Sequence, residues 1–183
     1  MLRIIGGSWR GRTWRFPAGD IRPTPDRVRE TLFNWLAPHI PGARCLDLFA
    51  GSGALGLEAL SRGAARTVFV EQAAAAAREL RQTLALWGGE PAAAAQLHVM
   101  DANQFLAGSP EAFDVVFLDP PFAAGLLGQF AARLETGRWL APAALIYAEC
   151  PARASLPQLP GGWTVAKTGR AGEVGYHLLR RTP

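Results

Sequence analysis

The chain has 183 residues, of which 49% are hydrophobic and 19% are charged. This length predicts one domain with a sizeable core, and this composition excludes a disordered chain. No apolar run is long enough for a membrane span or a signal peptide, so we expect a cytoplasmic protein. The two cysteines, Cys45 and Cys150, lie in apolar stretches and are expected to be buried thiols rather than a disulfide.

The positive charge is concentrated near the N-terminus. The formal net charge is +4, and residues 1–44 carry eight arginines against three acidic residues. A basic segment on a nearly neutral body predicts a polyanionic partner, although a solvated basic face would produce the same pattern.

The first elements expected in chain order are a small hairpin and one helix. Two short apolar–basic stretches, 2–5 and 12–16, flank a glycine-rich turn and predict a β-hairpin. The prolines of residues 17–25 predict a loop. Apolar residues recur at helical spacing over 26–36, which predicts a helix before Pro38 and Pro41.

From residue 44 onward, expected strands alternate with expected helices. The strands are 44–49, 66–71, 96–100, 113–119 and 143–149, and the helices are 54–62, 72–87, 102–107 and 123–136. A final pair of strands, 163–168 and 174–180, has the pattern of a hairpin. The fold class is therefore α/β, with a mostly parallel sheet, helices on both faces and an antiparallel pair at one edge.

A glycine-rich turn follows the first strand of this body. The segment Gly51-Ser52-Gly53-Ala54-Leu55-Gly56 fits G-x-G-x-x-G between an expected strand and an expected helix. Glycines let the backbone approach a ligand, and Glu71 at the end of the next strand can hold ribose hydroxyls. This fingerprint by itself is also typical of NAD binding.

Two acidic residues make NAD a less favoured ligand. Asp47 precedes the turn by four residues, and a carboxylate there suits a ligand with an ammonium or sulfonium charge better than a pyrophosphate. It could equally cap the backbone of the loop. The segment Asp119-Pro120-Pro121-Phe122 follows another strand and would face the same crevice, although Asp-Pro-Pro can also be a simple turn.

The residue types in 119–122 suit methylation of an exocyclic amine. The nitrogen lone pair of such an amine is delocalised into the ring, so a site must accept both N–H groups to free it. Asp119 and the Pro120 carbonyl supply acceptors, and proline brings no competing N–H. Phe122 can stack on the flat base. Positioning carries most of such a reaction, and neither a metal nor a covalent intermediate is needed.

These motifs resemble a known family. The stretch 46–64 resembles the first cofactor motif of class I S-adenosylmethionine methyltransferases, and 119–122 resembles their (D/N)PP(Y/F) motif. The lead-in Arg3–Arg12 and the block Arg22–Leu36 resemble the RsmD-type rRNA guanine-N2 methyltransferases. The resemblance continues nearly end to end, through 144–147 and 172–176.

The resemblance implies a Rossmann-like fold with a seven-stranded sheet and a small N-terminal hairpin extension. Residues 1–24 would form a basic extension for RNA contact, and residues 25–183 the catalytic core. The implied activity is transfer of a methyl group from S-adenosylmethionine to N2 of one guanine, position 966 in the family's usual numbering of 16S rRNA. The implied partner is 16S rRNA within a partly assembled small ribosomal subunit. Apart from the resemblance, nothing in the sequence demands more than a monomer, and we expect no membrane partner.

The same resemblance implies roles for individual residues. The catalytic group would be Asp119, Pro120, Pro121 and Phe122. The residues expected to hold the cofactor are Asp47, Phe49, Ala50, Gly51, Ser52, Gly53, Glu71, Gln72, Asp101 and Ala102. The residues expected to contact RNA or close over the site are Arg3, Trp9, Arg10, Arg12, Arg22, Thr24 and Arg27. We expect Trp9 to lie outside the core and to stack on a base, whereas Arg29 could serve the site or pair with nearby acids.

Other functions remain possible at this point. An enzyme that methylates another RNA, DNA adenine or protein glutamine would use the same Asp-Pro-Pro-aromatic chemistry. A non-enzymatic RNA-binding module would not need a tuned cofactor pocket. An NAD oxidoreductase is disfavoured because no His or Lys stands near the strand ends as a hydride partner.

Overall fold

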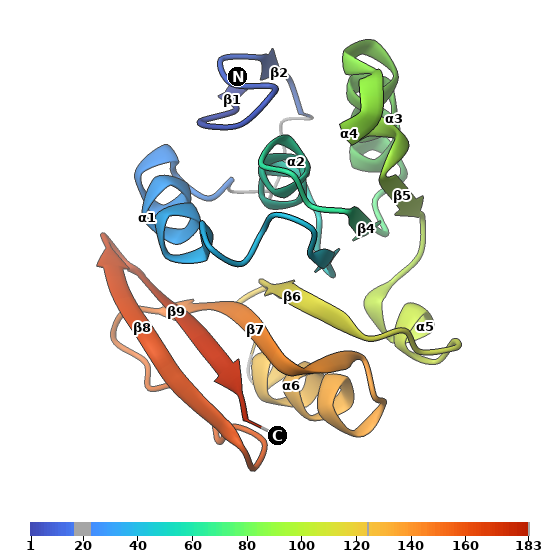
Figure 1. The fold of residues 1–183 in the computed structure, drawn as a ribbon. Helices are drawn as coiled ribbons and strands as arrows, with labels where there is room; N and C mark the ends of the chain where they lie inside the picture. Colours follow the sequence, from blue (N-terminus) through green and yellow to red (C-terminus); the bar gives the residue numbers. More distant parts are fainter. Residues whose placement is uncertain (17–22, 124, 183) are drawn as a thin grey trace.

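A computed structural model describes residues 1–16, 23–123 and 125–182 (Figure 1). The described helices are α1 Asp26–Leu36, α2 Ala54–Ser61, α3 Ala74–Trp87, α4 Gly89–Ala93, α5 Ala102–Leu106 and α6 Leu126–Thr136. The described strands are β1 Leu2–Arg3, β2 Thr13–Trp14, β3 Arg44–Asp47, β4 Arg66–Val70, β5 Ala95–His98, β6 Phe113–Leu118, β7 Leu140–Pro151, β8 Trp163–Ala171 and β9 Val174–Arg181. In these ranges no helix has both the length and the apolar character that a membrane crossing demands.

The large sheet confirms the expected α/β class. Its seven strands have the order β5-β4-β3-β6-β7-β9-β8. Strands β3 to β7 pair in parallel, and β9 runs antiparallel between β7 and β8. The strand order reverses between β3 and β6, which are neighbours although two other strands separate them in the chain. Ligands of open α/β sheets bind outside the carboxyl ends of strands at such a point.

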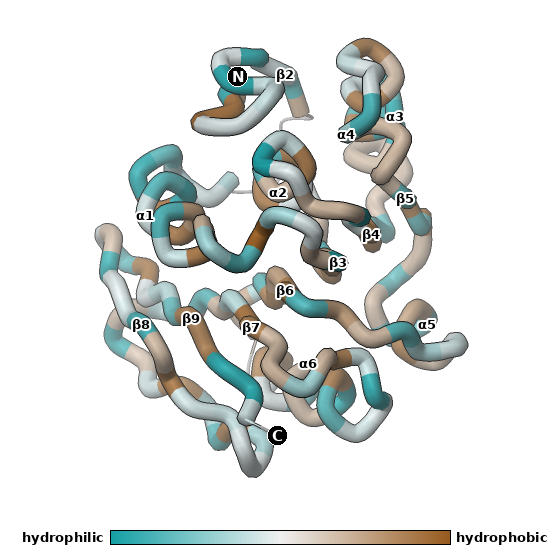
Figure 2. Tube along the Cα trace, viewed as in Figure 1, coloured by the Kyte–Doolittle hydropathy of each residue, from teal (hydrophilic) through white to brown (hydrophobic). Residues whose placement is uncertain are grey.

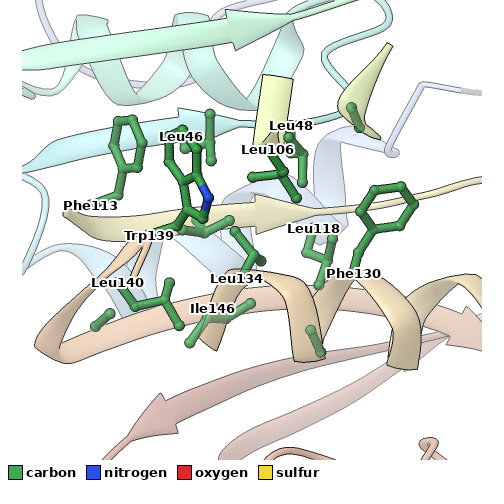
Figure 3. Close-up of a cluster of buried hydrophobic side chains, with 14 of the residues drawn as sticks. Leu46, Leu48, Leu106, Phe113, Leu118, Phe130, Leu134, Trp139, Leu140 and Ile146 are labelled. Carbon is green, nitrogen blue, oxygen red and sulfur yellow. The ribbon is translucent and has the colours of Figure 1, made fainter. Parts of the chain in front are cut away.

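Helices cover both faces of the sheet. Helices α5 and α6 bury residues such as Phe105, Phe130 and Leu134 on one face, where they pack against Leu46, Leu118 and other strand residues (Figure 3). On the other face, α1 and α2 pack through Leu32, Phe33 and Leu55. Helix α2 is buried along its whole length, whereas hydrophilic residues occupy much of α1 (Figure 2).

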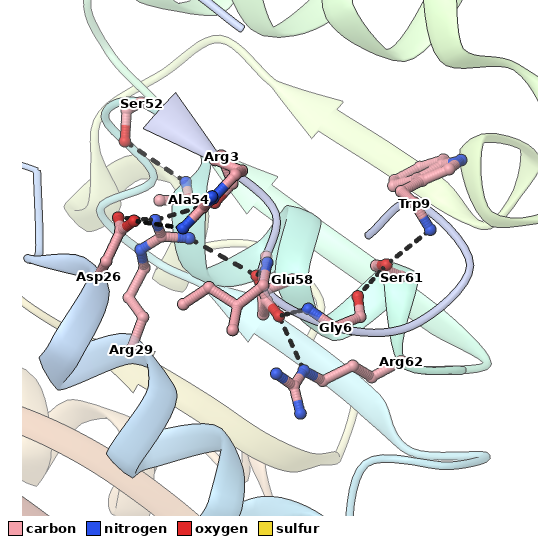
Figure 4. Close-up of polar contacts among 12 residues, drawn as sticks. Arg3, Gly6, Trp9, Asp26, Arg29, Ser52, Ala54, Glu58, Ser61 and Arg62 are labelled. Atoms are coloured by element: carbon pink, nitrogen blue, oxygen red, sulfur yellow. Dashed lines mark hydrogen bonds and ion pairs between the residues drawn. The ribbon is translucent and has the colours of Figure 1, made fainter. Parts of the chain in front are cut away.

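The N-terminal hairpin is held against α2 by both apolar and polar contacts. Trp9 and Trp14 are buried and place their rings 5.1 and 5.6 Å from that of Trp87 in edge-to-face geometry. The Trp9 backbone N–H also donates to the Ser61 hydroxyl at 2.9 Å (Figure 4). The expectation that Trp9 lies outside the core is therefore wrong. Its ring packs on Trp87 of α3 and offers no free face for a base, because Trp9, Trp14 and Trp87 belong to one cluster of buried residues that also includes Leu57 and Leu60 of α2.

A buried ion-pair network joins the hairpin, α1 and α2 (Figure 4). Glu58 is fully buried and accepts the backbone N–H groups of Ile5 and Gly6 at 2.9 and 2.8 Å. Its carboxylate also lies 3.5 Å from Arg29 and 2.8 Å from Arg62. The fully buried Arg29 is thus a structural residue, which settles the choice left open between a site role and a pairing role.

Several details of the fold differ from the sequence-based expectations; for example, α6 begins at Leu126 rather than at residue 123, and β8 ends at Ala171 rather than at residue 168. Helix α4 was not expected, since it is only five residues long and contains Pro91. Strand β7 begins three residues earlier than expected, and the register between β6 and β7 shifts where Pro142 enters the strand. A shift of this kind tolerates proline, which cannot donate to the ladder. Cys45 and Cys150 are buried free thiols, as expected.

Candidate active site

The glycine turn after β3 has the geometry that its sequence predicts. Gly51 and Gly53 have φ angles of 54° and 76°, in the region that favours glycine. A Cβ added to Gly56 would lie 2.2 Å from the Phe69 ring, so this glycine lets α2 pack closely on β4. Trp14 donates its indole N–H to the Ser52 carbonyl at 2.9 Å. The N-terminal hairpin therefore supports the turn directly.

Glu71 lies beside the turn at the carboxyl end of β4. Its two carboxylate oxygens accept the N–H groups of Gly51 and Ala73, both at 2.7 Å. A carboxylate has about four acceptor sites, so this arrangement orients Glu71 and leaves capacity for ribose hydroxyls. Gln72, which follows it, is exposed.

Asp47 lies underneath the turn. Its side chain is buried and accepts the Gly56 N–H at 3.0 Å. Burial raises the pKa of Asp47 to about 7, although the Gly56 hydrogen bond opposes this shift. The structure therefore shows the backbone cap that the sequence left as an alternative, and the carboxyl lies beneath the glycine turn.

Phe49 and Ala50 form the first part of the turn. Phe49 is half-buried and meets the ring of Phe130 edge-to-face at 4.9 Å. Ala50 is buried with the hairpin residues, and its N–H donates to the Val70 carbonyl at 3.0 Å. Packing contacts and a backbone hydrogen bond therefore fix both residues at the start of the turn.

Asp101 and Ala102 follow β5 at the same edge of the sheet. The Asp101 carboxylate accepts the Gln104 N–H at 2.9 Å and caps α5, and Gln104 completes a capping box. Ala102 is buried at the first position of this helix. Their expected contact with the adenine edge stays a prediction.

The Asp119–Phe122 segment leaves β6 next to the glycine turn. Strands β3 and β6 are adjacent, and the Leu48 N–H donates to the Phe117 carbonyl at 3.3 Å. Phe122 is 55% exposed, so its ring is free to stack on a flat ligand. Burial raises the pKa of Asp119 well above its ordinary value, and the charges of Glu149 and Asp47 add to this effect. A carboxyl with such a perturbed pKa, at the carboxyl end of a central strand, is a candidate functional group.

Glu149 belongs to this site, although the sequence analysis did not identify it. It lies near the end of β7, is buried, and accepts hydrogen bonds from the Tyr147 hydroxyl at 2.5 Å and the Thr24 hydroxyl at 3.2 Å. Burial raises the pKa of Glu149, and these two hydrogen bonds oppose the shift. Thr24 therefore lies against Glu149, and its expected role in closing over the site stays a prediction. The sequence signal that could have identified Glu149 is an acidic residue near the end of an otherwise apolar strand.

The arginines expected to contact RNA occupy different environments. Arg3, Arg10 and Arg27 are exposed. Arg12 is also exposed, and it donates to the Trp87 carbonyl at 2.9 Å. Arg22 lies outside the described residues. Among the residues that the structure describes, no group of three or more His, Cys, Asp or Glu side chains is arranged to hold a metal ion.

Comparison with known proteins gives consistent matches over almost the whole chain. The family model for Conserved hypothetical protein 95 matches residues 2–180. Ribosomal RNA small subunit methyltransferase D of Escherichia coli (strain K12) is 48% identical over 98% of this chain and 90% of that protein. The protein of the same name from Haemophilus influenzae is 43% identical over 98% of this chain and 93% of its own length. The solved structure of yhhF from Escherichia coli has a TM-score of 0.90 at 49% identity and covers 99% of this chain and 98% of that chain.

Proposed function

Since the chain belongs to the Conserved hypothetical protein 95 family, the RsmD family, we propose that it is an rRNA methyltransferase. Its reaction is transfer of a methyl group from S-adenosylmethionine to the exocyclic N2 amine of a guanine in 16S rRNA, position 966 in the family's usual numbering. The observation that carries this proposal is the juxtaposition of Asp119–Phe122 with the glycine turn at the point where the strand order reverses.

The residues around the turn fit S-adenosylmethionine. Gly51 and Gly53 place bare backbone along the crevice, and Glu71 is oriented to accept ribose hydroxyls. Asp101 and Ala102 would meet the adenine, and Asp47 adds a carboxyl beneath the methionine part. When bound, this cofactor supplies an electrophilic methyl group on a sulfonium centre.

The chain's own contribution is to hold the base and free its amine. The Asp119 carboxylate and the Pro120 carbonyl accept the two amine hydrogens, which rotates the nitrogen lone pair out of the ring plane. Pro121 carries no N–H that could compete, and Phe122 stacks on the base. Orientation of the amine toward the methyl group supplies most of the rate enhancement. Asp119 or solvent takes the released proton.

The exposed arginines supply the RNA contact in this proposal. Arg3, Arg10, Arg12 and Arg27 can pair with phosphates, with Arg22 and Thr24 on the segment that enters α1. Residues 1–24 act as the RNA-contacting extension of a core formed by 25–183. The substrate is a partly assembled small subunit in the cytoplasm, and the enzyme acts as a monomer.

A tritium-transfer assay tests this function. Labelled S-adenosylmethionine is offered with free 16S rRNA and with small subunits from cells that lack the modification, and the labelled nucleoside is identified after digestion. We expect N2-methylguanosine. The Asp119→Ala variant should lose transfer and retain cofactor binding, because Asp119 holds the base rather than the cofactor. Absence of label in both RNAs, with cofactor still bound, would favour another RNA, DNA adenine or protein glutamine as the substrate.

A further inference from the structure

Glu149 is a second buried carboxylate close to Asp119. Strands β6 and β7 are neighbours in the sheet (Figure 1) and pair in parallel. Leu118 lies opposite Ala148, so Asp119, just past the end of β6, and Glu149, still within β7, are the next residues along the two strands. We propose that Glu149 accepts the N1–H of the target guanine and thereby selects guanine over purines without that hydrogen. This inference rests on the proposed guanine-N2 function and assigns a specificity-determining residue to the same site.

Two hydroxyl groups hold the Glu149 carboxylate in a defined orientation. Tyr147, two residues earlier on the same face of β7, donates at 2.5 Å, and Thr24 donates at 3.2 Å from the segment before α1. Both hydrogen bonds end on Oε1. A buried carboxylate with one oxygen fixed in this way has little freedom to turn its other oxygen away.

The second oxygen is available to a ligand. Over the described ranges 1–16, 23–123 and 125–182, no donor is bound to Oε2 of Glu149 or to either carboxylate oxygen of Asp119. Glu149 keeps 8% of its surface exposed and Asp119 is half-buried, so both side chains retain some contact with solvent. Buried or half-buried acceptors without donors are costly, and a ligand that brings N–H groups removes that cost.

The Watson–Crick edge of guanine supplies the matching donors. Guanine presents N1–H beside its N2 amine, whereas adenine and 2,6-diaminopurine present a bare N1 acceptor at the same place. In the proposed function, Asp119 and the Pro120 carbonyl accept hydrogen bonds from the N2 amine. The N1–H group is then free to donate to the carboxylate of Glu149. A carboxylate that faces a bare N1 would place two acceptors against each other, so such a base is rejected.

The test compares guanine with 2,6-diaminopurine, which keeps the N2 amine and lacks N1–H. Each base is placed at the target position of 16S rRNA by ligation, the small subunit is reconstituted, and kcat/KM for methyl transfer is measured. The wild-type enzyme should prefer guanine by roughly 10- to 100-fold, as one lost charge-assisted hydrogen bond implies.

The Glu149→Gln variant keeps an oxygen for Tyr147 and Thr24 and turns an NH2 group toward N1. The preference for guanine over 2,6-diaminopurine should fall by roughly 10-fold or more, or reverse, because that NH2 donates to a bare N1. The matched control is Tyr147→Phe, which removes a supporting hydroxyl and should lower the rate on both bases while it leaves guanine preferred.

Two outcomes would overturn the inference. A wild-type enzyme that methylates both bases equally refutes it without any variant. An unchanged base preference in Glu149→Gln refutes it as well, including the case in which activity falls equally on both bases while cofactor binding is intact. In both cases N2-methylguanosine formation by the wild type leaves the proposed function standing, whereas absence of that product would refute the proposed function itself.

Discussion

The buried carboxyl of Asp47 should make the protein less stable as the pH rises. Burial raises its pKa from an ordinary 3.8 to about 7. The folded protein therefore binds this proton more tightly than the unfolded chain does. Between about pH 4 and pH 7 the unfolded chain ionises first, so this group's contribution to stability falls across that window and is constant above it. At about 1.36 kcal/mol per pH unit, the full cost is about 4 kcal/mol.

The Asp47→Asn variant removes this cost and keeps an oxygen for the Gly56 N–H. The difference in unfolding free energy between the variant and the wild type should therefore increase by about 3 kcal/mol from pH 5 to pH 8. This pH range covers most of the interval over which Asp47 ionises in the unfolded and folded states. Urea unfolding of both proteins at the two pH values, at constant ionic strength, measures the difference.

Asp114 provides a matched control with the opposite sign. Hydrogen bonds and charge from Arg44 lower its pKa, so this carboxylate stabilises the fold above its unfolded pKa and loses that contribution only in acid. Asp114→Asn should thus be destabilised equally at pH 5 and pH 8. A stability difference for Asp47→Asn that is the same at both pH values, or that shrinks as the pH rises, would refute the argument.

Three further results are expected. Replacing Arg10 and Arg12 by glutamine should weaken RNA binding and reduce the slope of log K against log salt by about 1.5, measured by filter binding; an unchanged slope would place the hairpin outside the RNA site. Glu58→Gln should lower the free energy of unfolding by about 1–3 kcal/mol in urea titrations, because it removes the buried carboxylate that Arg29 and Arg62 face and leaves Arg29 paired with Asp26 alone. The kcat/KM for methyl transfer should rise with pH as Asp119 ionises, with a midpoint well above that of an ordinary aspartate, and Asp119→Asn should lose this pH dependence.

Local patterns in the sequence were sufficient to predict the elements that frame the site. The glycines of 51–56 act through their own backbone conformation and close packing, so their motif predicts the turn without knowledge of distant residues. The alternation of strands and helices predicts the parallel sheet, whose carboxyl ends bring Glu71 and Asp119–Phe122 to one edge.

Burial of individual polar and aromatic residues was not predictable in this way. Trp9 stands among glycines and arginines in the sequence, yet it packs against Trp87, far along the chain. Arg29 has acidic neighbours on its own helix, yet its charge also faces Glu58 on α2. In both cases the partner comes from another element, and no local pattern contains it.

The order of the elements, the glycine turn and the Asp-Pro-Pro-Phe segment could be predicted from the sequence, because each depends on conformational preferences within a few residues. Two placements came from the packed fold: Trp14 of the hairpin supports the glycine turn, and Glu149 lies near Thr24 and Asp119. These placements depend on the register between strands and on contacts between residues as many as 125 positions apart. Such contacts form only when the whole sheet and its covering helices pack together.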